Sequence, residues 1–264
     1  MGLFLGIAKG LKRMHQSRGS RKPGRIQGRR RNGAEEDEDE AGERLMGDQN
    51  GDGEIRAYAH RDIKPGMYPF KPFFSLGSSN MEAGNIMIAD DGTTPIVMDL
   101  GSLSPSPQAI TSRSLALSVQ DTAAEHSTMP YRAPELFDVK TGSIIDTKVD
   151  IWSLGCTLYA CLVGKSPFEA RSEETGGSLS ICVLGGDWRF PDEKNTSGNS
   201  ASTANGAQAK SQSNGNAGKG EEYVISEPVK DIVRRCLSVE SAERPDVDEL
   251  IQLIEDAIPG LEDF

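Results

Sequence analysis

A short stretch of the chain carries a carboxylate and a lysine two residues apart, in the sequence His60-Arg61-Asp62-Ile63-Lys64. Two further oxygen-bearing side chains follow, Asn85 and the aspartate of Asp99-Leu100-Gly101. Mg²⁺ prefers oxygen ligands of this kind, and a lysine places a fixed positive charge where negative charge must be neutralised. Phosphoryl transfer needs two metal-binding groups and a residue that orients the attacking hydroxyl. The pattern therefore predicts phosphoryl transfer from a magnesium-bound nucleotide.

Two more sequences continue this order, Ala133-Pro134-Glu135 and Asp150-Ile151-Trp152-Ser153-Leu154-Gly155. The four motifs, which begin at His60, Asp99, Ala133 and Asp150, together resemble the catalytic, C-terminal lobe of a eukaryotic protein kinase. The resemblance covers residues 2–16, 57–66, 85–191 and 223–258. It implies an α+β fold of the protein kinase type, essentially the mainly α-helical C-terminal lobe with a small β-hairpin. We therefore expect one incomplete kinase domain over residues 2–258.

The resemblance implies catalytic roles for two residues of the first motif. Asp62 accepts or orients the proton of the substrate hydroxyl, and Lys64 neutralises charge on the transferred phosphoryl group. A lysine at this position is typical of serine/threonine kinases rather than tyrosine kinases. Asn85 and Asp99 bind Mg²⁺ and, with Lys64, hold ATP, while Gly101 permits the backbone turn that aims Asp99.

Other residues resemble structural positions of the family. These are His60, Arg61, Gly101, Thr128, Glu135, Asp150 and Arg244. The resemblance makes Arg61 a charge partner for a phosphorylated activation segment, and it makes Asp150 the hydrogen-bonded link between the central helix and the catalytic loop. Glu135 and Arg244 resemble a buried ion pair. Thr128 supplies a hydroxyl beside the catalytic loop, with simple packing as the alternative.

Longer stretches narrow the resemblance to the Numb-associated kinase family, and within it to the branch of myristoylated and palmitoylated serine/threonine kinases. They include Met98-Asp99-Leu100-Gly101-Ser102 and the sequence from Trp152 to Ala160. The resemblance implies protein substrates and ATP as partners. Members of this branch sit on Golgi, endosomal or vacuolar membranes through an acylated N-terminus. The start of this chain has Gly6 where Ser or Thr is preferred, so we expect a cytoplasmic protein without this anchor.

The periodicity of apolar residues predicts the elements that must position these side chains. Apolar residues share one face of a helix over residues 2–16, which needs a partner surface. Two short strands, 85–88 and 96–98, are predicted on either side of a turn. Residues 150–164 are apolar on nearly every side, which predicts a central buried helix ending at a glycine. Two amphipathic helices close the chain, around 229–237 and 247–254.

Two long stretches are too polar to join a hydrophobic core. Residues 17–56 hold an arginine-rich cluster followed by six consecutive acidic residues, which predicts a disordered charged insertion. Residues 192–222 are almost wholly small and polar, which predicts a low-complexity linker. Asp48 to Ile55 imitates the start of a calcium-binding loop, but its twelfth position is Ala59 rather than the glutamate that such loops require.

An insertion of 18 residues, 67–84, interrupts the catalytic loop between Asp62 and Asn85. The family spacing keeps both side chains on one rigid loop, so the insertion is expected to damage catalysis. Removing residues 67–84 restores the uninterrupted motif His-Arg-Asp-Ile-Lys-Pro-Gly-Asn. The codons at the two ends of the insertion can also contain the donor and acceptor sequences of an intron. These observations suggest the hypothesis of a retained intron, which genomic DNA lacking those sequences would exclude. The alternative is a true inserted loop.

No glycine-rich loop and no strand lysine precede His60, so the resemblance implies that the N-terminal lobe of the kinase fold is missing. That lobe normally covers the nucleotide, and we expect little or no activity from the chain as written. The alternative from another functional class is a catalytically dead kinase lobe that acts as a scaffold or interaction module. Retention of Asp62, Lys64, Asn85 and Asp99 favours the enzyme.

The composition excludes several other classes of function. The chain of 264 residues has 29 basic and 40 acidic side chains, a formal net charge of −11, which argues against general binding to nucleic acid. The four cysteines form no CxxC pair, so neither a zinc site nor a disulfide framework is expected. No apolar run approaches the roughly 20 residues that a bilayer-spanning helix requires, so direct membrane insertion is not expected.

Overall fold

A computed structural model describes residues 1–16, 57–66, 84–193 and 225–261 of the chain. The predicted insertion at 17–56 lies outside the described residues, as do 67–83 of the second insertion and 194–222 of the predicted linker. The first two residues of that linker, Asp192 and Glu193, lie in a short helical turn, η4 (Pro191–Glu193). None of the described helices is both long and apolar enough to cross a bilayer.

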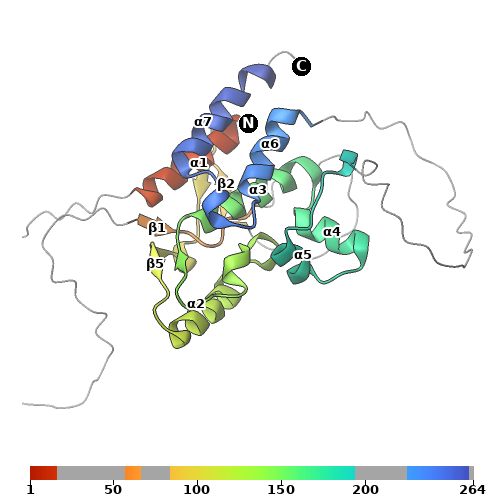
Figure 1. Ribbon diagram of the computed structural model, residues 1–264. Coiled ribbons are helices and arrows are strands. Elements are labelled where there is room, and N and C mark those ends of the chain that lie inside the picture. The colour runs from red at the N-terminus through yellow and green to blue at the C-terminus, as the bar shows by residue number, and fades with distance from the viewer. Residues whose placement is uncertain (17–56, 67–83, 194–224, 262–264) are drawn as a thin grey trace, which may run out of the picture.

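Helix α3 (Lys148–Val163) lies at the centre of the described structure, between α6 and the segment that carries α4 and α5 (Figure 1). Its residues from Val149 to Tyr159 are all buried, because nearly all of them are apolar or small. Trp152 stacks on Phe168 with ring centroids 5.2 Å apart. The helix ends at Gly164, whose φ of 90° is a left-handed conformation that glycine adopts without steric cost. The predicted central helix is therefore confirmed.

Helix α1 (Gly2–His15) packs along α7 (Val247–Ala257), and α6 (Glu227–Cys236) packs along α3 (Figure 1). The apolar face of α1 is buried as predicted, except that Leu3 is 37% exposed. Gly155 allows α3 and α6 to approach closely, since a Cβ atom there would lie 2.5 Å from the Cβ of Cys236. The three amphipathic helices predicted from periodicity thus cover the central helix and one another.

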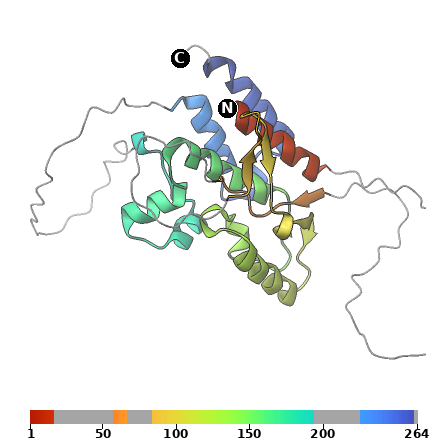
Figure 2. The ribbon, with the colours of Figure 1, turned by 180° about the vertical axis from the view of Figure 1, so that it is seen from behind.

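The strands form three small two-stranded antiparallel sheets within the described residues. The predicted hairpin is β2 (Ile86–Ile88) paired with β3 (Pro95–Val97), with Met87 opposite Ile96. Figure 2 shows this hairpin against α1, where it joins the catalytic loop to the body of the molecule. The other two pairs join β1 (Ala57–Ala59) to β4 (Ser104–Ser106) and β5 (Gln108–Ala109) to β6 (Ile144–Ile145).

Several elements were not predicted from the sequence. Helix α2 (Arg113–His126) projects from the body below β5, and its N-terminus is capped by Ser112, whose side chain accepts a hydrogen bond from the amide of Leu115 (Figure 1). Helices α4 (Pro167–Thr175) and α5 (Leu179–Gly185) follow α3. The remaining short helical turns are η1 (Leu100–Ser102), η2 (Met129–Tyr131), η3 (Pro134–Leu136), η5 (Ser241–Glu243) and η6 (Pro259–Leu261).

Candidate active site

Asp150 anchors the catalytic loop to the central helix. Its side chain is completely buried in the first turn of α3, and its two oxygens accept hydrogen bonds of 2.7 Å from the amides of His60 and Arg61. A carboxylate is favourable at this end of the helix, where the dipole is positive. Two consecutive amides of the loop are thus held at fixed distances from a buried helix. The structure therefore places Asp150 in the linking position that the resemblance implied.

Arg61 is held in a strained backbone conformation, with a φ of 68° that is uncommon for residues other than glycine. The side chain is buried, and its Nη2 donates a hydrogen bond of 2.8 Å to Oε1 of Gln108. Burial lowers the pKa of Arg61 from its usual range, and the charge of Asp150 opposes this shift. The resemblance implied a phosphorylated activation segment as the charge partner of Arg61. In the structure, Nη2 of Arg61 contacts the neutral side-chain amide of Gln108, the first residue of β5.

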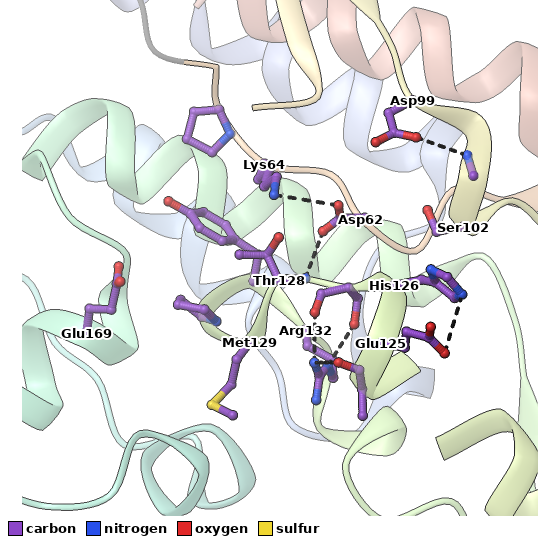
Figure 3. A pocket seen from close by; sticks show the side chains of 16 residues that line it. Asp62, Lys64, Asp99, Ser102, Glu125, His126, Thr128, Met129, Arg132 and Glu169 are labelled. Carbon is purple, nitrogen blue, oxygen red and sulfur yellow. Dashed lines mark hydrogen bonds and ion pairs between the residues drawn. The ribbon is translucent and has the colours of Figure 1, made fainter. Parts of the chain in front are cut away.

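Asp62 lies at the mouth of a cleft and accepts hydrogen bonds at both carboxylate oxygens (Figure 3). Its Oδ1 accepts from the amide of Thr128 at 2.8 Å, and its Oδ2 accepts from Nδ2 of Asn85 at 2.7 Å. The ammonium nitrogen of Lys64 lies 3.8 Å from Oδ2. These three donors hold the side chain of Asp62 in one orientation, from which a carboxylate oxygen can accept a hydrogen bond from an incoming hydroxyl.

Asn85 contacts Asp62 although 22 residues separate them in the sequence. The backbone N–H of Asn85 donates to the backbone carbonyl of Lys64 at 3.2 Å. Its side-chain Nδ2 also donates to the backbone carbonyl of Asp62 at 2.7 Å. On its other side, the carbonyl of Asn85 accepts from the amide of Met98. The insertion that begins at residue 67 therefore does not separate the two residues in the described structure.

Asp99 lines the same cleft as Asp62 and Lys64, and it comes from the end of the hairpin (Figure 3). Its backbone is left-handed, with a φ of 58°, and its Oδ1 accepts from the amide of Gly101 at 3.2 Å. His60 connects this strand to the catalytic loop, since its Nε2 lies 2.9 Å from the carbonyl oxygen of Met98. Ser102 donates to the carbonyl of His60 at 2.5 Å. These contacts position the carboxylate of Asp99 relative to the loop.

The cleft has a volume of about 800 Å³ and is walled by the end of α2 and by the segment that follows it. Its donor set fits a hard cation, since Asn85 adjoins Asp62 and Asp99 lies on the same cleft. Within the described ranges, no group of three or more histidine, cysteine or acidic side chains could enclose a metal ion by itself.

Glu135 and Arg244 form the ion pair that the resemblance implied. Two parallel hydrogen bonds of 2.8 Å join Nη1 and Nη2 of Arg244 to the two carboxylate oxygens of Glu135. The guanidinium also donates to three backbone carbonyls, those of Ser238, Lys148 and Val239. All five N–H groups of the arginine are therefore satisfied within the protein.

The sequence analysis missed His15, which contacts Asp150 from the last turn of α1. Its Nε2 lies 2.9 Å from Oδ2 of Asp150, and the ring is buried. The signal was present in the sequence, because His15 follows Leu11 by four residues and so lies on the buried face of the helix. Gln108 was not predicted either, and no sequence pattern gives a signal for it. Arg132, which lines the cleft beneath Asp62, was also given no predicted role.

Replacing His15 by alanine is expected to lower the free energy of unfolding by about 2 kcal/mol, because a buried carboxylate loses one of its donors. The variant His15→Gln keeps an N–H donor of similar reach and is expected to lose less than half as much. Urea unfolding of the full chain, followed by circular dichroism, measures both values. Equal losses for the two variants would mean that packing, and not the hydrogen bond to Asp150, explains the effect.

Comparison with known proteins places this geometry in a family. Residues 81–253 match the protein kinase domain. Serine/threonine-protein kinase ENV7 of Saccharomyces cerevisiae is 30% identical over 200 residues, which are 76% of this chain and 42% of that protein. Serine/threonine-protein kinase ppk13 of Schizosaccharomyces pombe is 39% identical over 135 residues, 51% of this chain and 34% of that protein. Serine/threonine-protein kinase 16 of Homo sapiens is 38% identical over 128 residues, 48% of this chain and 35% of that protein.

The chain therefore spans between about a third and two fifths of the length of these relatives. The matched range contains Asn85, which contacts Asp62, and Asp99, which lines the cleft, together with the helix that carries Asp150. The family match covers well over half of the chain, and the geometry of the cleft agrees with it. This chain belongs to the protein kinase family.

Proposed function

We propose that this chain supplies the catalytic loop and the metal-binding residues of a serine/threonine protein kinase, which transfers the γ-phosphoryl group of ATP to a protein hydroxyl. The observation that carries the proposal is the set of contacts around Asp62. Its carboxylate faces the cleft between Lys64, Asn85 and the amide of Thr128, and Asp99 lines the same cleft. The names of the relatives support the same class of reaction.

In this proposal each side chain has one task. Mg²⁺, held by Asn85 and Asp99, would neutralise charge on the phosphates of ATP. Asp62 accepts the hydrogen bond of the substrate hydroxyl and orients its oxygen towards the phosphoryl group. Lys64 lies 3.8 Å from Oδ2 of Asp62 and brings a positive charge to the place where the transferred group carries negative charge. The amide of Thr128 keeps the carboxylate of Asp62 in orientation.

We infer that the exposed face of the hairpin receives the base of the nucleotide. Met87 and Ile96 are paired across β2 and β3, and they are 47% and 46% exposed. Met98 continues this apolar surface beside Asp99. A planar base can pack on such a surface while its phosphates reach Asn85 and Asp99, because Met87 follows Asn85 by two residues.

The experiment that tests the proposal measures transfer of labelled phosphate from ATP to a mixed serine, threonine and tyrosine peptide library by the full chain. We expect little labelling at most, slow, magnesium-dependent and confined to serine and threonine, because no described segment covers the phosphates. Replacing Asp62 or Asp99 by asparagine is expected to reduce this labelling about 100-fold, to background. The matched control is Asp90→Asn, an exposed aspartate in the hairpin turn, which should leave the rate unchanged. Labelling that persists in Asp62→Asn and Asp99→Asn would contradict the proposal.

The alternative function, a scaffold without catalysis, is favoured by one observation. Met87, Ile96, Met98 and Leu100 are between 41% and 56% exposed, and such a group of apolar side chains fits a protein interface. The same assay separates the two functions. A chain that neither binds Mg²⁺·ATP in calorimetry nor labels any peptide, yet unfolds cooperatively, would favour the scaffold.

We infer the finer assignment, to the branch of myristoylated and palmitoylated kinases within the Numb-associated family, from two stretches of sequence. These are residues 98–102 and the sequence from Trp152 to Ala160. Both lie in the described structure, the first at the turn that carries Asp99 and the second in α3. Protein substrates are proposed on the same basis. A cytoplasmic location and the absence of direct membrane insertion or nucleic-acid binding by this chain are proposed from its composition. Labelling of tyrosine rather than serine or threonine in the peptide library would contradict the kinase assignment.

A further inference from the structure

The guanidinium of Arg132 caps the C-terminal end of α2. Its Nη2 donates to the carbonyls of Ser127 and Ala124 at 2.7 and 3.3 Å, and its Nε donates to the hydroxyl of Ser127 at 2.7 Å. The last carbonyls of a helix have no partner within the helix, and a positive charge is favourable at this end of the dipole. Arg132 is 7% exposed and also lies over the ring of Phe137, 5.0 Å from its centroid.

The capped end of α2 leads directly to the catalytic carboxylate. Thr128 follows Ser127 without an intervening residue, and its amide donates to Oδ1 of Asp62 at 2.8 Å. Burial lowers the pKa of Arg132, and the negative charge of Asp62 opposes this shift, which indicates that the two charges lie within electrostatic reach of each other. A displacement of Ser127 would therefore move a hydrogen-bond donor of Asp62.

The same segment forms the wall of the cleft that a protein substrate must approach. Thr128, Met129 and Tyr131 line the cleft, and Figure 3 shows Met129 and Arg132 on the side below Asp62. The far end of the wall is tied to the central helix, because the hydroxyl of Ser153 donates to the carbonyl of Tyr131 at 2.8 Å. The wall is thus held at one end by α3 and at the other end by Arg132.

We propose that Arg132 is a positioning residue for the protein substrate: it holds the wall from Ser127 to Tyr131 against α2 and so sets how a peptide hydroxyl meets Asp62. The inference rests on the proposed kinase function. We expect different effects on the two substrates, because Thr128 of the wall contacts Oδ1 of Asp62, whereas Asn85, which is proposed to hold Mg²⁺·ATP with Asp99, contacts Oδ2. Loss of Arg132 should therefore weaken peptide use and leave nucleotide use unchanged.

The kinetic test compares Arg132→Gln and Arg132→Lys with the unmodified full chain, using a serine peptide selected in the library assay. We expect kcat/KM for the peptide to fall 10- to 100-fold in Arg132→Gln while KM for ATP stays constant, because a misplaced wall costs orientation of one substrate only. Arg132→Lys should recover part of the loss, since it keeps a cation at the helix end but lacks the second donor group. The matched control is Arg113→Gln, an exposed arginine at the other end of α2, which should behave as the unmodified chain.

Hydrogen exchange tests the role of Arg132 even if the chain transfers no phosphate. A lack of phosphate transfer would overturn the proposed function but not the positioning of the wall by Arg132. Hydrogen exchange of backbone amides should accelerate over residues 124–129 in Arg132→Gln and stay unchanged within α3. Unchanged exchange over residues 124–129 would overturn the positioning role. So would KM values for peptide and ATP that rise together, because they would indicate a general loss of structure.

Discussion

Replacing Glu135 by alanine is expected to lower the free energy of unfolding by about 3–5 kcal/mol, because the guanidinium of Arg244 would remain buried without its counter-charge. The side chain of Arg244 has no exposed surface, while that of Glu135 is 21% exposed. The guanidinium also lies 4.9 Å from the centre of the Trp152 ring, so water cannot readily replace the carboxylate. For a domain of this size, such a loss corresponds to a fall in Tm of about 6–20 °C, which calorimetry of the full chain measures.

The double variant Glu135→Ala/Arg244→Met provides the control for this prediction. It removes both charges, so the penalty of an unpaired buried cation disappears and the remaining cost is that of three backbone carbonyls without their donor. We therefore expect the double variant to be more stable than Glu135→Ala alone. The loss in the double variant should be well below the sum of the two single losses. Additive losses would mean that the two side chains act independently, against the geometry of the pair.

The central helix, the hairpin and the helices α1, α6 and α7 could be predicted because each is recorded in a local pattern. In α1, α6 and α7 the apolar residues recur with the period of a helix, whereas α3 is apolar on nearly every side and ends at Gly164. The candidate site residues were predicted for a different reason: their types suit phosphoryl transfer, and their order along the chain resembles that of protein kinases. Neither kind of signal depends on contacts between residues distant in sequence.

Helix α2 was not predicted, because the stripe that it buries is short and weakly apolar, while Leu117 on its other face is exposed. Only Ala116, Val119 and Ala123 are buried, and its position depends on partners far along the chain, such as Arg132. The contact of Gln108 with Arg61 likewise arises only after folding, since nothing near Gln108 in the sequence indicates a buried cation. Features set by such distant contacts need the structure itself.

Deleting the insertion, residues 67–84, is expected to stabilise the chain and to leave the contact between Asp62 and Asn85 intact. Gly84, the last residue of the insertion, lies against Gly66, which precedes the insertion, since a Cβ atom built on Gly84 would lie 2.1 Å from the Cα of Gly66. Closing a loop of 18 residues costs about 2.5 kcal/mol of chain entropy, which the deletion removes. Tm should therefore rise by about 5–10 °C in differential scanning calorimetry.

Two observations in the structure argue that this deletion leaves the catalytic loop undisturbed. The amide of Asn85 already donates to the carbonyl of Lys64, so Lys64, Pro65, Gly66 and Asn85 would form an ordinary four-residue turn once joined. Pro65 also bridges to Ile86, which fixes the direction of the chain beyond the junction. The matched control replaces 67–83 by a glycine and serine linker of equal length and should leave Tm unchanged. A deletion variant that is less stable than the unmodified chain would mean that the insertion contributes contacts to the fold, which favours a true inserted loop over a retained intron.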